Sequence, residues 1–539
     1  MRSSSATDGY HAGRTAHVWS IPDRFNIATA CLDRHAVGKG RPALICVEAD
    51  GAAWTISFDT LLTWTCRLAN ALTGLGAEAG DRVAILLPQS VETAIAHFAT
   101  YRAGLIALPL FTLFGEEALA FRLVDSGARF LITDRTNAAK LADIWDQLPA
   151  LERVLLVDGE DGPGTVDFWA TLNRGAAQFT PVDTAAEDPA LIIYTSGTTG
   201  QPKGALHAHR VLLGHLPGVE HPHQFFPQRG DRFWTPADWA WIGGLLDVLL
   251  PSLYHGVPVV ANRMTKFDPE AAFDVITRYG VRNIFFPPTA LKLMREAPAR
   301  QHTGVRSIGS GGESLGEALL VWGEETFGVS IAEFYGQTEC NLVVGSNPAL
   351  FPTQPGAIGK AIPGHRVAIL AEDGRVVPDG EVGQIAVQSP DPVMFLRYWN
   401  QPSATAAKFV DGPDGRYLLT GDTGSRDADG YFRFVAREDD VITSAGYRIG
   451  PGEIEDCLLS HPAVSMAAVV GVPDPIRTEI IKAVVVPKPG VEAGARLKSD
   501  LQTHVKVRLA AHEYPRIVEF RDRLPMTATG KIIRRALRD

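Results

Sequence analysis

The sequence predicts an α/β protein in which a large N-terminal domain is followed by a small C-terminal α/β domain. Over the first three-quarters of its 539 residues, apolar strand-like segments alternate with helix-like segments. Between residues 411 and 450 the composition changes to glycines, aspartates and short strands, which is typical of a β-rich edge followed by a hinge. Because a single core seldom grows beyond about 250–300 residues, the length also favours more than one domain.

The alternation is clearest early in the chain. Asp81–Pro88 has the composition of a buried strand that a proline stops. Ser90 can cap a helix whose apolar side chains recur at helical spacing, and Gly104 can end it before a strand over 105–110. Helix-like 118–127 and strand-like 130–134 repeat the pattern. Such units favour parallel or mixed sheets covered by helices.

The composition excludes several classes of protein. Hydrophobic residues make up 45% and charged residues 21%, which is ordinary globular usage and not that of a disordered, collagen-like or coiled-coil chain. The net charge of −10 gives no indication of nucleic acid or an anionic membrane as partner. The five cysteines are scattered without a CxxC pair, so we expect no disulfide framework and a reducing cytoplasm. We find no secretory signal and no run near the ~18 apolar residues of a membrane span, and expect no integral membrane association.

The strongest chemical signal is the segment Tyr194–Gly204, YTSGTTGQPKG, directly after a strand-like run. Glycines let backbone N–H groups turn inward around phosphate oxygens, while hydroxyls and one lysine add donors and charge. Pro202 stands where a Walker A loop needs glycine. A flexible surface loop is the alternative, but the position after a buried strand favours phosphate binding. The predicted phosphate-binding residues are Thr195, Ser196, Gly197, Thr198, Thr199, Gly200 and Lys203.

This segment resembles the signature loop of the adenylate-forming superfamily, which includes acyl-CoA synthetases, luciferases and peptide-synthetase adenylation domains. Five more motifs follow in the family's order: GSGGESL at 309–315, EFYGQTE at 333–339, YLLTGD at 417–422, AREDDVITSAGYRIG at 436–450 and PMTATGK at 525–531. The resemblance runs from about residue 25 to the C-terminus. It implies an N-terminal extension over 1–24, a large domain over 25–438 for ATP and the acid, and a small mobile domain over 439–539 with its hinge at Asp439.

The resemblance also implies a nucleotide site. Adenine would lie against the turn Gly312, Glu313, Ser314 and the segment Glu333, Phe334, Tyr335, Gly336, Gln337, Thr338. Asp422 would accept the ribose hydroxyls with help from Arg437, and Glu339 would hold Mg²⁺ beside the phosphates. Without these neighbours, Tyr335 would be interpreted as a core aromatic and Glu339 as a solvated side chain.

The implied catalytic residues are Lys531, Glu339, Thr195 and Lys203. Lys531 would bridge the acyl carboxylate and the α-phosphate, where negative charge develops; the alternative is one more exposed basic residue in an arginine-rich tail. After adenylation the small domain would rotate, so that Ser444, Ala445, Gly446 and Tyr447 face the adenylate and CoA, and Arg448 would meet phosphate in one of the two conformations.

The acyl pocket is predicted from FWTPADWAWIGG at 233–244, which resembles the pocket helix of short- and medium-chain acyl-CoA synthetases. Its implied residues are Trp239, Trp241, Ile242, Gly243, Gly311 and Gly336. Acetate-specific members place a tryptophan just before QTE, where this chain has Gly336. The missing indole would leave room for several methylenes, each worth about 0.8 kcal/mol when buried. We therefore expect an acid larger than acetate, short to medium in chain length, with aryl or branched acids as the alternative.

Together these motifs predict an AMP-forming acyl-CoA synthetase that uses ATP, CoA and a carboxylic acid with Mg²⁺. Two alternatives stay open: an adenylating enzyme that loads a carrier protein or oxidises its adenylate, and a non-catalytic nucleotide-binding protein. A homodimer is also left open. The histidine triplets HAH (207–209) and HPH (221–223) are expected on the surface or in loops, because neither has a third ligand at zinc spacing.

Overall fold

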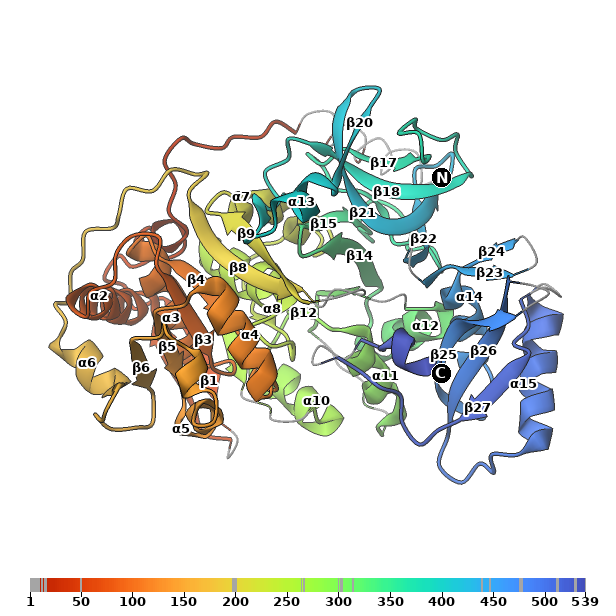
Figure 1. Cartoon of the computed structure of the whole chain (residues 1–539), viewed down its shortest axis with the longest axis horizontal. Coiled ribbons are helices and arrows are strands. Elements are labelled where there is room, and N and C mark those ends of the chain that lie inside the picture. Colours follow the sequence, from red (N-terminus) through yellow and green to blue (C-terminus); the bar gives the residue numbers. More distant parts are fainter. Residues whose placement is uncertain are drawn as a thin grey trace.

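The structure is a computed structural model of the chain (Figure 1). It describes residues 10, 13, 17–48, 51–195, 201–262, 264, 267–298, 300, 304–312, 315–437, 440–444, 447–474, 478–509, 513–527 and 531–538. For residues 443, 447, 448, 453 and 478 it describes the backbone alone. Within these residues the strands form four sheets, of nine, eight, five and five strands.

The nine-stranded sheet runs through the middle of the N-terminal domain. Its strands, in spatial order, are β16 (Lys360–Ala361), β15 (Cys340–Gly345), β14 (Ile331–Gln337), β13 (Ser307–Gly311), β12 (Asn283–Phe285), β10 (Phe233–Trp234), β11 (Val259–Asn262), β1 (Pro42–Val47) and β2 (Ala53–Ser57). Every pair from β14 to β1 is parallel, and the flanking pairs are antiparallel. The sheet is thus mixed, as the sequence predicts.

The eight-stranded sheet has the same character. Its strands, in spatial order, are β19 (Arg397–Tyr398), β9 (Lys203–Ala208), β8 (Pro189–Thr195), β4 (Ile106–Pro109), β3 (Arg82–Leu86), β5 (Phe130–Thr133), β6 (Arg153–Leu156) and β7 (Thr165–Asp167). The pairs from β8 to β7 are parallel, whereas β9 and β19 are antiparallel to their neighbours.

Helices cover both faces of these sheets. One core joins the two sheets through α2 (Phe58–Gly74), α3 (Val91–Arg102), α7 (Val211–Glu220) and α9 (Leu250–Tyr254). The opposite face of the nine-stranded sheet packs against α10 (Pro269–Arg278), α11 (Pro288–Glu296) and α12 (Glu317–Phe327), and that of the eight-stranded sheet against α4 (Glu116–Ser126). Strands buried on both faces have to be apolar throughout, which explains runs such as VAIL in β3.

Further short helical segments connect the strands. They are η1 (Thr29–Asp33), α5 (Arg135–Ala138), η2 (Ala139–Leu141), η3 (Trp145–Gln147), α6 (Phe168–Arg174), α8 (Ile242–Gly244), η4 (Leu245–Leu249) and α13 (Pro402–Ala406). The predicted cap at Ser90 is confirmed, since its hydroxyl accepts a hydrogen bond from the amide of Thr93 at 3.2 Å. Gly104 follows α3 with a φ of +68°, a conformation that glycine adopts without steric cost.

A β-rich sheet follows the two large ones and lies at the top of Figure 1 in cyan. Its strands are β17 (Val367–Leu370), β18 (Val382–Ser389), β21 (Gly415–Arg426), β20 (Phe409–Gly412) and β22 (Phe432–Arg437), all paired antiparallel. This confirms the predicted β-rich part of the large domain.

The C-terminal domain has its own sheet, drawn in blue in Figure 1. Its strands are β24 (Tyr447–Ile449), β23 (Ile442–Ser444), β26 (Thr478–Pro487), β25 (Val464–Asp474) and β27 (Ile517–Phe520). One face packs against α14 (Pro451–Leu459) and α15 (Ala495–Arg508). The other face buries Leu524 and, from η6 (Arg534–Leu537), Leu537. The C-terminal tail is therefore fixed to the sheet by apolar packing.

The prediction that the histidine triplets lie on the surface is wrong, although His209 and residues 221–223 do lie in turns, as the loop alternative expects. His207, His209, His221 and His223 are all buried, and burial lowers the pKa of each. His207 lies in β9, and the other three lie in the turns after β9 and α7. Neighbouring segments cover them, such as Phe351 beside His221 and Phe233 beside His223. Among the described residues, no helix combines the length and apolar character needed to cross a lipid bilayer.

Candidate active site

A cavity of about 890 Å³ lies between the large domain and the C-terminal domain. It is lined by residues at or just after the carboxyl ends of β8, β13 and β14, by residues of β21 and β22, and by α14 and the C-terminal tail. Open α/β sheets bind ligands outside the carboxyl ends of their strands. The position of this cavity therefore agrees with a substrate site.

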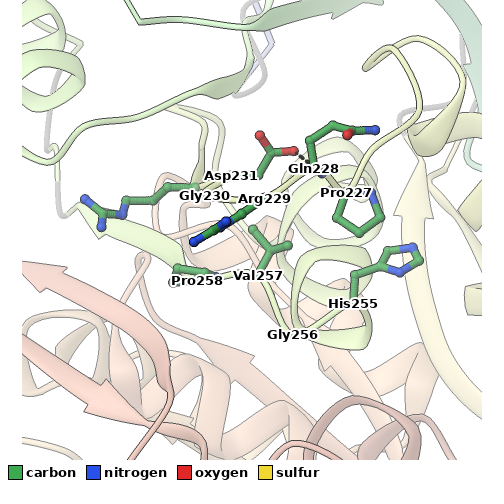
Figure 2. A pocket seen from close by; sticks show the side chains of 10 residues that line it. Pro227, Gln228, Arg229, Gly230, Asp231, His255, Gly256, Val257 and Pro258 are labelled. Carbon is green, nitrogen blue, oxygen red and sulfur yellow. Dashed lines mark hydrogen bonds between the residues drawn. The ribbon is translucent and has the colours of Figure 1, made fainter.

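A second cavity of about 460 Å³ lies at the amino ends of strands β10 and β11 of the nine-stranded sheet (Figure 2). It is lined by residues 227–232 and 255–258, which precede β10 and β11. Its buried carboxylate, Asp231, is neutralised by two contacts from Arg306, at 2.7 and 3.0 Å. This cavity shares no lining residue with the first.

Tyr335 and Asp422 join the nine-stranded sheet to the β-rich sheet inside the first cavity. The Tyr335 hydroxyl and the Gln337 side-chain amide both donate hydrogen bonds to Oδ2 of Asp422, each at 2.6 Å. Arg437 stands opposite Asp422 in the β21–β22 ladder, with its Nε 3.6 Å from Oδ1 of the carboxylate. Three predicted nucleotide residues thus hold one carboxylate in a fixed orientation.

Glu339, Tyr398 and Lys203 form a second cluster in the same cavity. The buried Tyr398 hydroxyl donates a hydrogen bond to Oε1 of Glu339. Lys203 Nζ lies 5.2 Å from the centre of the Tyr398 ring, and Lys203 pairs with Thr195 across β8 and β9. Thr195 and Lys203 stand at the two ends of the predicted phosphate-binding segment. The cluster therefore places a carboxylate, a cation and a hydroxyl beside this segment.

This cluster fits a magnesium ion bound together with phosphates. Mg²⁺ takes one or two carboxylates and completes its shell with phosphate oxygens and water. Within the part of the chain that the structure describes, no group of three or more His, Cys, Asp or Glu side chains could enclose a metal. Glu339 would therefore supply one ligand and the nucleotide and water the others.

Glu333 is a buried carboxylic acid at the cavity wall. Burial, followed by the nearby carboxylate of Asp456, raises the pKa of Glu333 to about 8. The backbone of Leu315 offsets part of this by hydrogen bonding to the carboxylate. Glu333 is consequently protonated at neutral pH and able to donate a hydrogen bond. Asp456 belongs to α14, so the C-terminal domain contributes to this environment.

Lys531 is brought into the cavity by the C-terminal tail. Thr527 and Lys531 hydrogen bond through their backbones at 2.7 Å, and Arg534 in η6 forms an ion pair with Glu455 of α14 at 2.8 Å. A Cβ placed on Gly312 would lie 3.7 Å from Cε of Lys531 and 3.7 Å from the indole of Trp241. Lys531 therefore reaches the turn after β13, as the predicted catalytic role requires.

Ser444 is the one predicted CoA-side residue whose side chain the structure describes, and it does not line this cavity. Ser444 is buried at the end of β23, and the backbones of Tyr447 and Arg448 lie in β24. Several predicted residues lie outside the described part of the chain: Ser196, Gly197, Thr198, Thr199, Gly200, Glu313, Ser314, Asp439, Ala445 and Gly446. The structure thus shows Lys531 at the cavity, whereas Ser444 at the end of β23 is not part of its wall.

A Cβ on any of the three glycines of the predicted acyl pocket would meet neighbouring atoms, although Gly336 itself lines the cavity. A Cβ on Gly336 would lie 2.3 Å from the amide nitrogen of Leu342, and one on Gly311 would lie 2.6 Å from the Phe334 ring. On Gly243 it would lie 2.8 Å from Phe285. The expectation that Gly336 leaves room for the acyl chain is therefore wrong, because the backbone of β15 occupies that direction.

The other predicted pocket residues divide into two groups. Trp241 lines the cavity, as does Phe334 of the predicted nucleotide site, and Trp241 also packs against Phe285 with ring centres 5.5 Å apart. Trp239 and Ile242 are buried and are not part of the cavity wall. The side of the cavity next to Gly312 is consequently apolar and aromatic.

Comparison with known proteins identifies the family. Residues 32–399 match the model of the "AMP-binding enzyme" family, and residues 453–531 match its "AMP-binding enzyme C-terminal domain". The chain belongs to the AMP-binding enzyme family.

Three similar proteins of this family illustrate its range. The mouse mitochondrial acyl-coenzyme A synthetase ACSM4 is 34% identical over 96% of this chain and 91% of its own. The acetyl-coenzyme A synthetase of Bacillus subtilis (strain 168) is 33% identical over 96% of this chain and 90% of its own. The crystal structure of the anthranilate CoA ligase AuaEII in complex with anthranoyl-AMP is 28% identical, with a TM-score of 0.87 over 96% of this chain and 97% of its own. The chain is accordingly an enzyme with the ligase fold of this family.

The family motifs do not reveal every residue of the cavity. Sequence reasoning missed Tyr398, Lys408, Lys292, Arg534 and Arg122, all of which line it. Arg534 follows the family lysine by three residues, which is a usable signal. The other four stand in no motif, and only the packing of distant segments places them here.

Proposed function

We propose that this enzyme is an AMP-forming acyl-CoA synthetase. It converts a carboxylic acid and MgATP to an acyl-adenylate and pyrophosphate, and then forms the acyl-CoA thioester with release of AMP. The observation that carries this proposal is the reach of Lys531 to Gly312, in the same cavity as the Tyr335–Asp422 and Glu339–Lys203 clusters. These residues place charged side chains where a nucleoside triphosphate and a carboxylate would meet.

In the first half-reaction, a carboxylate oxygen of the acid attacks the α-phosphorus, and the bond to the β-phosphate breaks. The Lys531 ammonium stabilises the negative charge that develops between carboxylate and α-phosphate. Lys203 and the hydroxyl of Thr195 bind phosphate oxygens, and Asp422 accepts hydrogen bonds from the ribose. Glu339 would hold a Mg²⁺ ion together with the phosphates, and the ion would supply positive charge to the departing pyrophosphate.

In the second half-reaction, the CoA thiolate attacks the acyl carbonyl carbon and the carbon–oxygen bond to AMP breaks. The thiol proton is released to solvent. In this proposal the domain over 439–539 rotates at Asp439, withdraws Lys531 and presents the β23–β24 hairpin to the adenylate. The support is that Lys531 lines the cavity whereas Ser444, at the end of β23, does not.

We further propose that the acid is larger than acetate and of short to medium chain length. The support is the aromatic wall formed by Trp241 and Phe334, together with the medium-chain-type motifs of the sequence. An aryl acid is the second candidate, because the structural relative AuaEII is crystallised with anthranoyl-AMP. The glycines give no support to either choice, since their Cβ directions are filled.

The test is a reaction of the purified protein with ATP, Mg²⁺, CoA and a panel of C2–C10, branched and aromatic acids. AMP, pyrophosphate and thioester are measured separately. Equal amounts of all three products, with a C3–C10 acid preferred, support the proposal. AMP release without any CoA-dependent thioester would refute it and favour loading of a carrier protein.

Three further expectations belong to this proposal. Chelation of Mg²⁺ should abolish turnover, and Glu339→Gln should raise the Mg²⁺ concentration required, whereas the exposed control Glu372→Gln should not. The cytoplasm is the predicted compartment, which fractionation of cells tests. Light scattering distinguishes a monomer from a homodimer.

A further inference from the structure

Two arginines are more than nine-tenths buried among the described residues, and they differ in one respect. Arg102 is 5% exposed, and its guanidinium makes two contacts with the carboxylate of Asp33, at 2.7 and 3.1 Å. Arg122 is 6% exposed, and its guanidinium donates only to a backbone carbonyl and forms no ion pair with a described carboxylate. Arg122 is therefore a buried cation without an ion-pair partner in the described part of the chain.

The contacts of Arg122 leave hydrogen-bonding capacity unused. Its Nη1 donates to the carbonyl of Ala118 in its own helix at 2.7 Å, and its guanidinium carbon lies 4.0 Å from the centre of the Phe114 ring. Its Nε is buried and has no hydrogen-bond partner among the described residues. Asp125, one turn further along α4, accepts its hydrogen bond from the Tyr194 hydroxyl instead, at 2.6 Å.

Arg122 lines the same cavity as Lys203 and Tyr194. Tyr194 immediately precedes Thr195, and its ring centre lies 5.7 Å from the Arg122 guanidinium. The side chain is thus held at the start of the phosphate-binding segment by a helix and two aromatic rings. Burial lowers the pKa of Arg122 to about 10, so the group is charged at neutral pH.

A buried charge is costly unless an ion of opposite sign compensates it. Guanidinium groups match phosphate oxygens in geometry, and they bind them with charge-assisted hydrogen bonds. The substrates of the proposed reaction supply such oxygens in this cavity. We propose that Arg122 is a phosphate-binding residue that contacts phosphoryl oxygens of a substrate in the active-site cavity. This inference rests on the proposed function.

Two substrates could supply the phosphate, the triphosphate of ATP and the diphosphate of CoA. The position beside Tyr194 and Lys203 is compatible with both. The experiment therefore has two arms. The first measures ATP–pyrophosphate exchange with saturating acid and no CoA, and the second measures thioester formation from supplied acyl-adenylate at varied CoA.

The variants are Arg122→Met, which keeps the length of the side chain, and Arg122→Lys, which keeps its charge. Arg153→Met is the matched control. Arg153 is exposed in β6 of the eight-stranded sheet, against which α4 packs, and it contacts the carbonyl of its neighbour Glu152. Because a charge-assisted hydrogen bond is lost, Arg122→Met should raise KM about tenfold for ATP or pyrophosphate in the first arm, or for CoA in the second. Arg122→Lys should recover part of the loss, and the control should match the wild type.

Unchanged KM values in both arms would overturn the inference. A variant with a lower melting temperature but unchanged KM values would overturn it as well. If Arg122→Met does not fold, Arg122→Lys alone decides, because a single ammonium replaces the guanidinium fork and should still raise KM severalfold in one arm. A wild-type protein that forms neither AMP nor thioester would instead refute the proposed function. The two failures are therefore distinguishable.

Discussion

The hydroxyl of Tyr335 donates a hydrogen bond to the carboxylate of Asp422 at 2.6 Å, between residues 87 positions apart in the chain. Tyr335 lies in β14 of the nine-stranded sheet and Asp422 in β21 of the β-rich sheet. The bond therefore joins two sheets that meet in one shared hydrophobic core, to which Tyr335 itself belongs. It also fixes the carboxylate that we propose for the ribose, and Gln337 donates to the same oxygen.

Tyr335→Phe should weaken ATP binding without removing the aromatic ring. A net loss of about 1 kcal/mol for one hydrogen bond corresponds to a roughly fivefold rise in KM for ATP. Steady-state kinetics at varied ATP measure it. Tyr431→Phe is the control, because it loses a comparable bond, to the carbonyl of Pro352 at 2.9 Å, outside the cavity. Equal KM values for the two variants would contradict the role of the bond.

Lys531→Ala should separate the two half-reactions. Adenylation needs the ammonium between carboxylate and α-phosphate, and removing such a stabilising charge typically costs about 100-fold to 1,000-fold in rate. Thioester formation from supplied acyl-adenylate does not need it and should stay near the wild-type rate. Equal losses in both assays would show that Lys531 supports the fold or both steps alike. Arg535→Ala, in the same tail, tests for a general effect of its charge.

The titration of Glu333 predicts a pH-dependent stability difference. Its pKa is about 8 in the folded protein and about 4.3 in an unfolded chain. Between these two pKa values, the folded state keeps a proton on Glu333 that the unfolded state has released. The free energy of unfolding therefore falls as pH rises through this window, until the pKa of about 8 is passed.

Glu333→Gln removes this titration while keeping the shape of the side chain. The free energy of unfolding of the variant minus that of the wild type should be larger at pH 9 than at pH 5. The increase should exceed about 1.4 kcal/mol, the value of one pKa unit. Thermal or urea unfolding at both pH values, without ligands, measures it. Other buried acids, such as Asp238, titrate in both proteins and cancel in the difference. A constant difference across the range would contradict a raised pKa.

Trp241→Ala should widen the acid specificity. The indole stands between Phe285 and the turn at Gly312, at the wall of the cavity. Its removal frees volume for several methylenes, so kcat/KM for longer or branched acids should rise about tenfold relative to short ones. The acid panel measures this shift, with Trp145→Ala at the surface as control. An unchanged profile would place the acyl group elsewhere.

Local signals explain why much of the fold was predictable. The helix after Ser90 and the strands around it depend on neighbouring residues, and all of them form as expected. The nucleotide residues were predictable because contiguous motifs contain them. Tyr335, Asp422 and Lys531 then meet in one cavity although they lie far apart in the chain.

Long-range packing explains what the sequence could not reveal. The buried state of His207 depends on which distant segments cover β9, and no local pattern encodes those contacts. In the sequence, Gly336 suggests space left by a missing side chain. In the structure, the backbone of β15 lies so close to Gly336 that there is no room for a Cβ atom. Arg122 stands in an ordinary helix, and its lack of an ion-pair partner among the described residues becomes visible only when its surroundings are known.

The central claim is that the acid is activated as an acyl-adenylate, and an oxygen label tests it most directly. The preferred acid, labelled with ¹⁸O at both carboxylate oxygens, is converted with ATP, Mg²⁺ and CoA, and the products are analysed by mass spectrometry. Attack on the α-phosphorus predicts one ¹⁸O in AMP and one in the thioester carbonyl. Unlabelled AMP, or ADP with ¹⁸O in inorganic phosphate, would contradict the account.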